Sequence, residues 1–147
     1  TRRMLSMTGK RLGVDYGDVR TGLAVSDPSG LIATGVGTVK PGGMRNTARV
    51  VAAAAAEHGC TGIVVGLPKN MDGSEGFRAD ACKELGDILK CIANFPVLFW
   101  DERLTTVSAH RFLSDNNVRG KKRKSVVDAV SADIILQDYI DNRRNKA

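Results

Sequence analysis

Short apolar runs alternate along the chain with longer stretches in which apolar residues recur every three or four positions. Runs rich in β-branched residues and bounded by Gly, Asp or Pro predict strands, and the three-to-four spacing predicts helices. The expected strands are Arg11–Tyr16, Thr21–Ser26, Leu31–Val39, Thr61–Val65 and Pro96–Trp100. The expected helices are Asn46–His58, Gly76–Ile92, Val107–Asn116 and Ser125–Asn142.

The order of these elements predicts an α/β fold with one mixed, five-stranded sheet flanked by helices. Short links rich in Gly, Asp and Pro join the first three strands, which favours an antiparallel meander. The last two strands are almost continuously apolar, as parallel strands covered on both faces are. The 147 residues suit a single domain, in which residues 1–10 are a flexible or processed segment and residues 143–147 a flexible tail.

Composition adds a preference for a polyanionic partner. The net charge is +6 and the pI about 9.5, which favours nucleic acid. Three cysteines without a CxxC spacing argue against a disulfide framework and a zinc site, and favour a reducing compartment. No run is long and apolar enough to cross a membrane. The first ten residues are basic and hydroxylated, which leaves open an organelle transit-peptide remnant.

Acidic residues stand at the ends of two apolar strands. Asp15 ends the first strand, and Asp101 and Glu102 follow the strand PVLFW. Because functional groups gather at the carboxyl ends of strands in an open sheet, we expect these acids to converge. Converging carboxylates raise one another's pKa or bind a hard divalent cation. The alternative is that an aspartate at a strand end only forms a turn.

The last expected helix carries a fourth acid, Asp128. Helical spacing puts Asp128 on one face with Ala132, Ile135 and Tyr139, and we expect that face to turn to the sheet. A buried carboxylate is costly without a cation or hydrogen-bond donors. If the helix crosses the same sheet edge, the acids could hold Mg²⁺ or Mn²⁺ for phosphodiester hydrolysis. Asp128 could instead be a helix cap or a first-turn acid.

Basic and amide side chains in loops are candidates for substrate contacts. The turn GDVRTG could direct Arg20 toward a phosphate, or it could be a hairpin turn with an exposed arginine. The run GKKRK could bind the nucleic-acid backbone, or it could be a solvated loop. The expected substrate contacts are Arg20, Lys69, Asn70, Arg103, Lys121, Lys122, Arg123 and Lys124.

Four stretches resemble the YqgF/RuvX family of the RNase H-like superfamily: GVDYGDVRTGLAVSDPSG, IVVGLPKNMDGSEG, DERLTTVSA and KSVVDAVSADIILQDYI. The resemblance runs from about Arg11 to Tyr139. It implies an RNase H-type sheet in which Asp15 matches the first-strand acid and Asp128 the last-helix acid. It also implies that at least one residue of the pair Asp101 and Glu102 is catalytic.

The resemblance further implies a metal-dependent nuclease that processes the 5′ end of the 16S ribosomal RNA precursor. One alternative is a Holliday-junction resolvase acting on branched DNA, which should be a symmetric dimer because two related strands are cut. Another is a non-catalytic nucleic-acid or ribosome-assembly binding module. One departure is Lys69, where family members usually have an apolar residue. The expected location is cytoplasmic in a bacterium, or a plastid or mitochondrion in a eukaryote. The chain is expected to be a monomer or homodimer, without a membrane partner.

Overall fold

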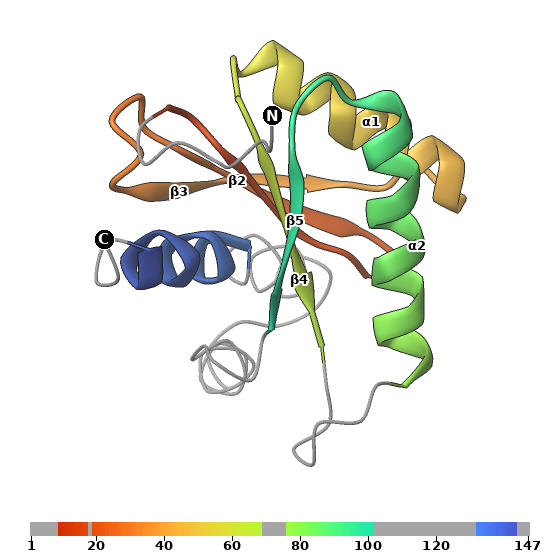
Figure 1. Cartoon of the computed structure of the whole chain (residues 1–147). Helices are drawn as coiled ribbons and strands as arrows, with labels where there is room; N and C mark the ends of the chain where they lie inside the picture. Colours follow the sequence, from red (N-terminus) through yellow and green to blue (C-terminus); the bar gives the residue numbers. More distant parts are fainter. Residues whose placement is uncertain (1–8, 18, 69–75, 102–131, 144–147) are drawn as a thin grey trace.

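A computed structural model of the chain describes residues 9–17, 19–68, 76–101 and 132–143. Its centre is a five-stranded sheet in the order β3-β2-β1-β4-β5 (Figure 1). The pairs β1–β2 and β2–β3 are antiparallel, and the pairs β1–β4 and β4–β5 are parallel. The strands are β1 (Leu12–Asp15), β2 (Thr21–Ser26), β3 (Ala33–Val39), β4 (Ile63–Leu67) and β5 (Val97–Asp101). The predicted mixed sheet, with its meander and two parallel strands, is confirmed.

Helices cover both faces of the sheet. The helices α1 (Met44–Glu57) and α2 (Phe77–Ile92) pack on one face, and the C-terminal helix, residues 132–143, packs on the other (Figure 1). The expected helix Val107–Asn116 lies outside the described residues, as do residues 125–131 of the expected last helix. Among the described helices, none has the length and apolarity needed to span a bilayer.

Two separate hydrophobic clusters follow from the alternation of side chains along the central strands. Leu12 and Val14 of β1 belong to the cluster beneath α1 and α2, together with Val65 of β4. Val64 of β4 belongs to the cluster beneath the C-terminal helix. Strand β4 therefore has both faces covered, which explains why its sequence is continuously apolar rather than alternating.

The C-terminal helix lies very close to β1. Ala132, Ile135 and Tyr139 are all buried, so the face predicted to turn to the sheet does so. A Cβ atom added at Gly13 would lie 2.7 Å from the Cβ of Leu136 and 3.0 Å from the carbonyl oxygen of Ala132. The absence of a side chain at position 13 is therefore what allows this helix to approach the central strand.

Strand β3 begins two residues later than the sequence predicts. The expected strand started at Leu31, but the backbone amides of Leu31 and Ile32 donate to Oδ1 of Asp27 at 2.8 and 3.1 Å. Both amides are thereby satisfied by a side chain instead of by a neighbouring strand. Regular pairing with β2 starts at Ala33.

Strand β4 lies two residues further along the chain than predicted. The expected bounds were Thr61–Val65, whereas the structure has Ile63–Leu67. The two additional residues pair in parallel with Trp100 and Asp101 of β5. This shift matters because it moves the end of β4 level with the acids that end β1 and β5.

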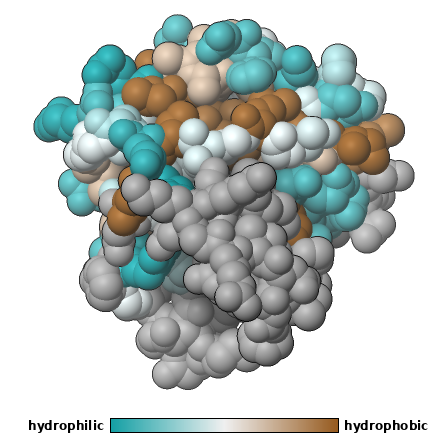
Figure 2. All heavy atoms as spheres, turned by 180° about the vertical axis from the view of Figure 1, so that it is seen from behind, coloured by the Kyte–Doolittle hydropathy of each residue, from teal (hydrophilic) through white to brown (hydrophobic). Residues whose placement is uncertain are grey.

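The surface carries apolar side chains in separate places. In Figure 2, hydrophobic areas are interspersed with hydrophilic ones across the upper part of the molecule. Among the described residues, the large hydrophobic side chains that are exposed are Val19, Leu31, Ile32, Val36 and Ile92. Scattered apolar residues of this kind are ordinary on a protein surface.

Candidate functional site

Asp15 is the last residue of the central strand β1, and it is only 5% exposed. Its neighbour Val14 packs beneath α1 and α2. Because successive side chains of a strand point to opposite faces, Asp15 belongs to the face covered by the C-terminal helix. A carboxylate is thus held on a rigid, well-packed strand near the carboxyl end of the parallel part of the sheet.

Glycines flank Asp15 on both neighbouring strands. Gly22 of β2 pairs directly with Asp15. On the other side, Val14 pairs with Val65 of β4, and the next residue of β4 is Gly66. Neither neighbouring strand therefore adds a side chain directly beside the Asp15 carboxylate.

Asp101 ends β5 but faces away from Asp15. Phe99 packs beneath α2, since a Cβ atom added at Gly86 of α2 would lie 2.2 Å from the Phe99 ring. Trp100 packs against the C-terminal helix, where its ring meets Tyr139 edge to face at 6.0 Å between centroids. Alternation therefore places Asp101 on the α1 and α2 face, opposite to Asp15. The two strands are also about 10 Å apart, because β4 lies between them.

Arg20 follows the turn after β1 and is only 8% exposed. The sequence left open an exposed arginine in a hairpin turn, and that alternative is wrong. The turn itself is tight, because a Cβ atom added at Gly17 would lie 2.6 Å from the carbonyl oxygen of Arg20. A contact between Arg20 and a phosphate stays a prediction.

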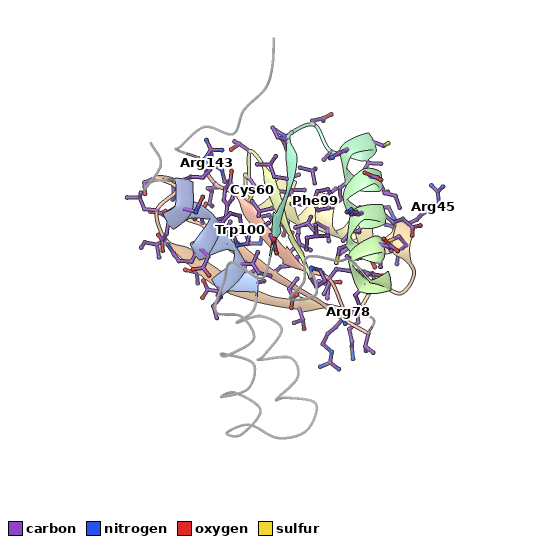
Figure 3. All side chains as sticks on the ribbon, turned by 60° about the horizontal axis from the view of Figure 1, so that its bottom comes forward. Arg45, Cys60, Arg78, Phe99, Trp100 and Arg143 are labelled. Atoms are coloured by element: carbon purple, nitrogen blue, oxygen red, sulfur yellow. The ribbon has the colours of Figure 1, made fainter. Side chains whose placement is uncertain are left out.

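Arg78 is a cation near Asp15 that the sequence did not single out. It lies in the first turn of α2, and its Nη2 donates to the carbonyl oxygen of Tyr16, the residue after Asp15, at 3.1 Å. Figure 3 shows Arg78 at the border of the molecule, far from Arg45 of α1. The only signal in the sequence is that Arg78 begins the helix after a long polar loop, and the contact joins residues 62 positions apart.

The C-terminal helix carries a partly buried carboxyl group, that of Asp133. Burial raises the pKa of the Asp133 carboxyl above its ordinary value of 3.8, because the ionised form loses hydration.

Within the described part of the chain, no group of three or more His, Cys, Asp or Glu side chains is close enough to hold a metal ion. Asp15 is therefore the one expected metal ligand that the described residues present on this face.

Comparison with protein-family models identifies the family of the chain. Residues 9–142 match the family model RuvX, described as Holliday junction resolvase. The chain belongs to the RuvX family. The match spans every described strand and all but the last residue of the C-terminal helix, so the candidate site lies within the region that defines RuvX proteins.

Curated RuvX relatives cover almost the same length. A protein of Clostridium tetani is 42% identical over 135 residues, which are 92% of this chain and 98% of the relative. A protein of Clostridioides difficile is 41% identical over 139 residues, 95% of this chain and 99% of the relative. A Myxococcus xanthus protein is 42% identical and covers 92% of this chain and 89% of the relative. All three carry the name "Putative pre-16S rRNA nuclease".

Solved structures confirm the RNase H-like fold expected of a RuvX protein. RuvC of Thermus thermophilus in complex with a Holliday junction substrate superposes with a TM-score of 0.58 at 15% identity, covering 95% of this chain and 98% of RuvC. A second Thermus thermophilus RuvC structure gives a TM-score of 0.52 at 13% identity, covering 92% and 96%. At such low identity, the likeness concerns the fold alone.

The other expected site residues of this RuvX chain lie outside the described residues. They are the acids Glu102 and Asp128 and the polar or basic residues Lys69, Asn70, Arg103, Lys121, Lys122, Arg123 and Lys124. Their roles stay predictions from the sequence and its resemblance.

Proposed function

We propose that this protein is a metal-dependent endonuclease that hydrolyses phosphodiester bonds in a ribosomal RNA precursor. The observation that carries the proposal is the buried carboxylate of Asp15, fixed at the end of the central strand between two glycines in a chain of the RuvX family. The relatives named as pre-16S rRNA nucleases support the 5′ end of 16S precursor RNA as the substrate. A net charge of +6 suits such a polyanion.

The donor chemistry around Asp15 fits a hard divalent cation. Carboxylate oxygens are the ligands that Mg²⁺ and Mn²⁺ prefer, and the flanking Gly22 and Gly66 add no side chains beside them. We propose that Asp15, Glu102 and Asp128 hold the ion. When bound, Mg²⁺ or Mn²⁺ supplies activation of the attacking water and stabilisation of the charge on the leaving oxygen.

The residues of the chain itself would orient the substrate around that centre. Asp15 would keep a fixed position because β1 is paired on both sides within the sheet. Support for Asp128 comes from Ala132, four positions later in the chain, whose carbonyl oxygen lies close to Gly13, two residues before Asp15. The basic residues Arg20, Lys69, Arg103 and Lys121–Lys124 would position phosphates along the backbone.

The first test replaces Asp15 with asparagine, which has the same shape and no charge. We expect Asp15→Asn to lower metal-dependent cleavage of labelled 16S precursor RNA at least about a hundredfold while RNA binding remains. Thermal melting checks that Asp15→Asn still folds, so that a loss of cleavage is not a loss of structure.

The matched control is Asp87→Asn, an exposed acid of α2, which should cleave like the wild type. Wild-type cleavage by folded Asp15→Asn would contradict the proposal. A wild-type protein that binds RNA but cuts nothing with Mg²⁺ or Mn²⁺ would favour a binding module.

A second substrate class is favoured by the description of the family model, Holliday junction resolvase. A four-way DNA junction belongs in the same assay, with light scattering to test for the symmetric dimer that a resolvase needs. Cleavage of the junction but not of the RNA would replace the ribosomal substrate. For a ribosomal substrate we propose a location where ribosomes are made, which is the cytoplasm of a bacterium or an organelle.

A further inference from the structure

The side chain of Arg78 is exposed, yet it is anchored beside the strand end that carries Asp15. Its Nη2 donates to the carbonyl oxygen of Tyr16 at 3.1 Å, and Tyr16 directly follows Asp15 in the chain. The bond connects the first turn of α2 to the residue that follows β1. An anchored guanidinium loses less conformational freedom on binding a ligand than a freely moving one.

Arg78 also keeps most of its hydrogen-bonding capacity. A guanidinium has five N–H donors, and the structure gives this one a single hydrogen bond and no ion pair among the described residues. The acceptor is a neutral carbonyl oxygen, so the positive charge is not cancelled by its anchor. The remaining donors suit the oxygens of a phosphate, which a guanidinium binds with two parallel hydrogen bonds.

We propose that Arg78 is a substrate contact that binds a backbone phosphate of the nucleic acid on the α2 side of Asp15. The inference rests on the proposed nuclease function and adds a residue to it. It implies that the nucleic-acid backbone crosses the end of β1 toward the start of α2. This contact is additional to any made by the basic loops expected from the sequence. Arg78 is thus a positioning contact, separate from the proposed metal ligands.

The test compares two exposed arginines of the same protein. Arg78→Gln removes the proposed contact, and Arg45→Gln removes the same charge from an exposed position of α1, far from Arg78 (Figure 3). Binding of labelled 16S precursor RNA is measured without divalent metal, so that nothing is cut, over a series of salt concentrations. Thermal melting of both variants checks that they fold.

We expect Arg78→Gln to bind about tenfold more weakly at low salt. The slope of log affinity against log salt should fall in magnitude by roughly 0.7–0.9, as for the loss of one phosphate contact. Arg45→Gln should match the wild type in both measures. Arg78→Lys should be intermediate, because an ammonium keeps the charge but not the paired donors.

Each other outcome overturns the inference. Equal losses in both arginine variants would show non-specific attraction, and an Arg78→Gln protein that binds like the wild type would show no contact. A lower melting temperature and slower cleavage, with an unchanged slope of log affinity against log salt, would show that Arg78 only stabilises the end of β1. Wild-type protein that neither binds nor cuts the RNA would instead be a failure of the proposed function, visible before any variant is compared.

Discussion

At the scale of single residues, the two consecutive acids Asp101 and Glu102 are not equivalent candidates. Asp101 lies on the face of the sheet beneath α1 and α2, and Asp15 lies on the opposite face. A single metal centre needs carboxylates from the same side. We therefore propose Glu102, rather than Asp101, as the partner of Asp15.

A pair of neutral substitutions separates the two acids. Glu102→Gln should lower metal-dependent cleavage at least about a hundredfold, as expected for Asp15→Asn. Asp101→Asn should change it by no more than about threefold, because its carboxylate points away from the site. Cleavage rates at saturating metal give the comparison, and binding of Mn²⁺ followed by calorimetry gives a readout independent of turnover. The reverse ranking would make Asp101 the ligand.

Asp133 predicts a pH-dependent gain in stability. Its pKa is raised by burial, so this group penalises folding at neutral pH. The penalty disappears as the pH falls below the unfolded value of 3.8, where the side chain is protonated in both states. Asp133→Asn should therefore be more stable than the wild type at pH 7 and equal to it near pH 3. Urea unfolding at the two pH values is the measurement, and an equal difference at both would contradict the assignment.

Residue-scale prediction from the sequence worked where the cause is local. Asp15 ends an apolar run, and the run alone indicates a carboxylate at the end of a buried strand. Arg78 was missed because its contact with Tyr16 depends on how α2 packs beside β1, which no local pattern encodes. The opposite orientations of Asp15 and Asp101 likewise needed the register of three strands.

At the scale of elements, the C-terminal helix is fixed to the sheet through Gln137. Its Oε1 accepts from the backbone amide of Ala33 at 2.8 Å, and its Nε2 donates to the carbonyl oxygen of Leu31 at 2.9 Å. The carboxamide thus satisfies one donor and one acceptor at the start of the edge strand β3. Nε2 also donates to Asp141 within the helix at 3.1 Å.

Removing this link should loosen the helix and the strand together. Gln137→Ala should lower the free energy of unfolding by about 1–3 kcal/mol, because two backbone groups lose a partner. Hydrogen exchange of the Ala33 amide should become faster. Asp141→Ala is the control, since it removes only a bond inside the helix and should cost less than about 0.5 kcal/mol. Unchanged exchange at Ala33 in Gln137→Ala would show that the link does not hold this edge.

The bounds of elements were less predictable than their types. The order of strands and helices follows from periodicity, which is a property of each segment. The start of β3 depends on the carboxylate of Asp27, which takes the amides of Leu31 and Ile32. The end of β4 depends on pairing with β5, more than thirty positions away. Side-chain capping and tertiary pairing therefore decide where an element stops.

At the scale of the whole molecule, the topology gathers the candidate site from distant parts of the chain. Strand β1 is central, with β2 on one side and β4 on the other, so its carboxyl end adjoins both the first hairpin and the loop after β4. Periodicity and position made the overall sheet and the strand-end acids predictable, and the resemblance to a family implied the roles of those acids. The placement of glycines beside Asp15 on two different strands emerges only from the assembled sheet.

The close packing of the C-terminal helix on Gly13 affects how the protein folds during its synthesis. The helix is the last described element of the chain, and the strand that it covers is the first. Synthesis proceeds from the amino end at about 5–20 residues per second, so β1 leaves the ribosome well before its cover. Until the C-terminal helix has left the ribosome, the face that bears Asp15 is open to water. An activity that depends on this enclosed carboxylate therefore requires residues 132–143 to have been made, and a shorter nascent chain lacks it.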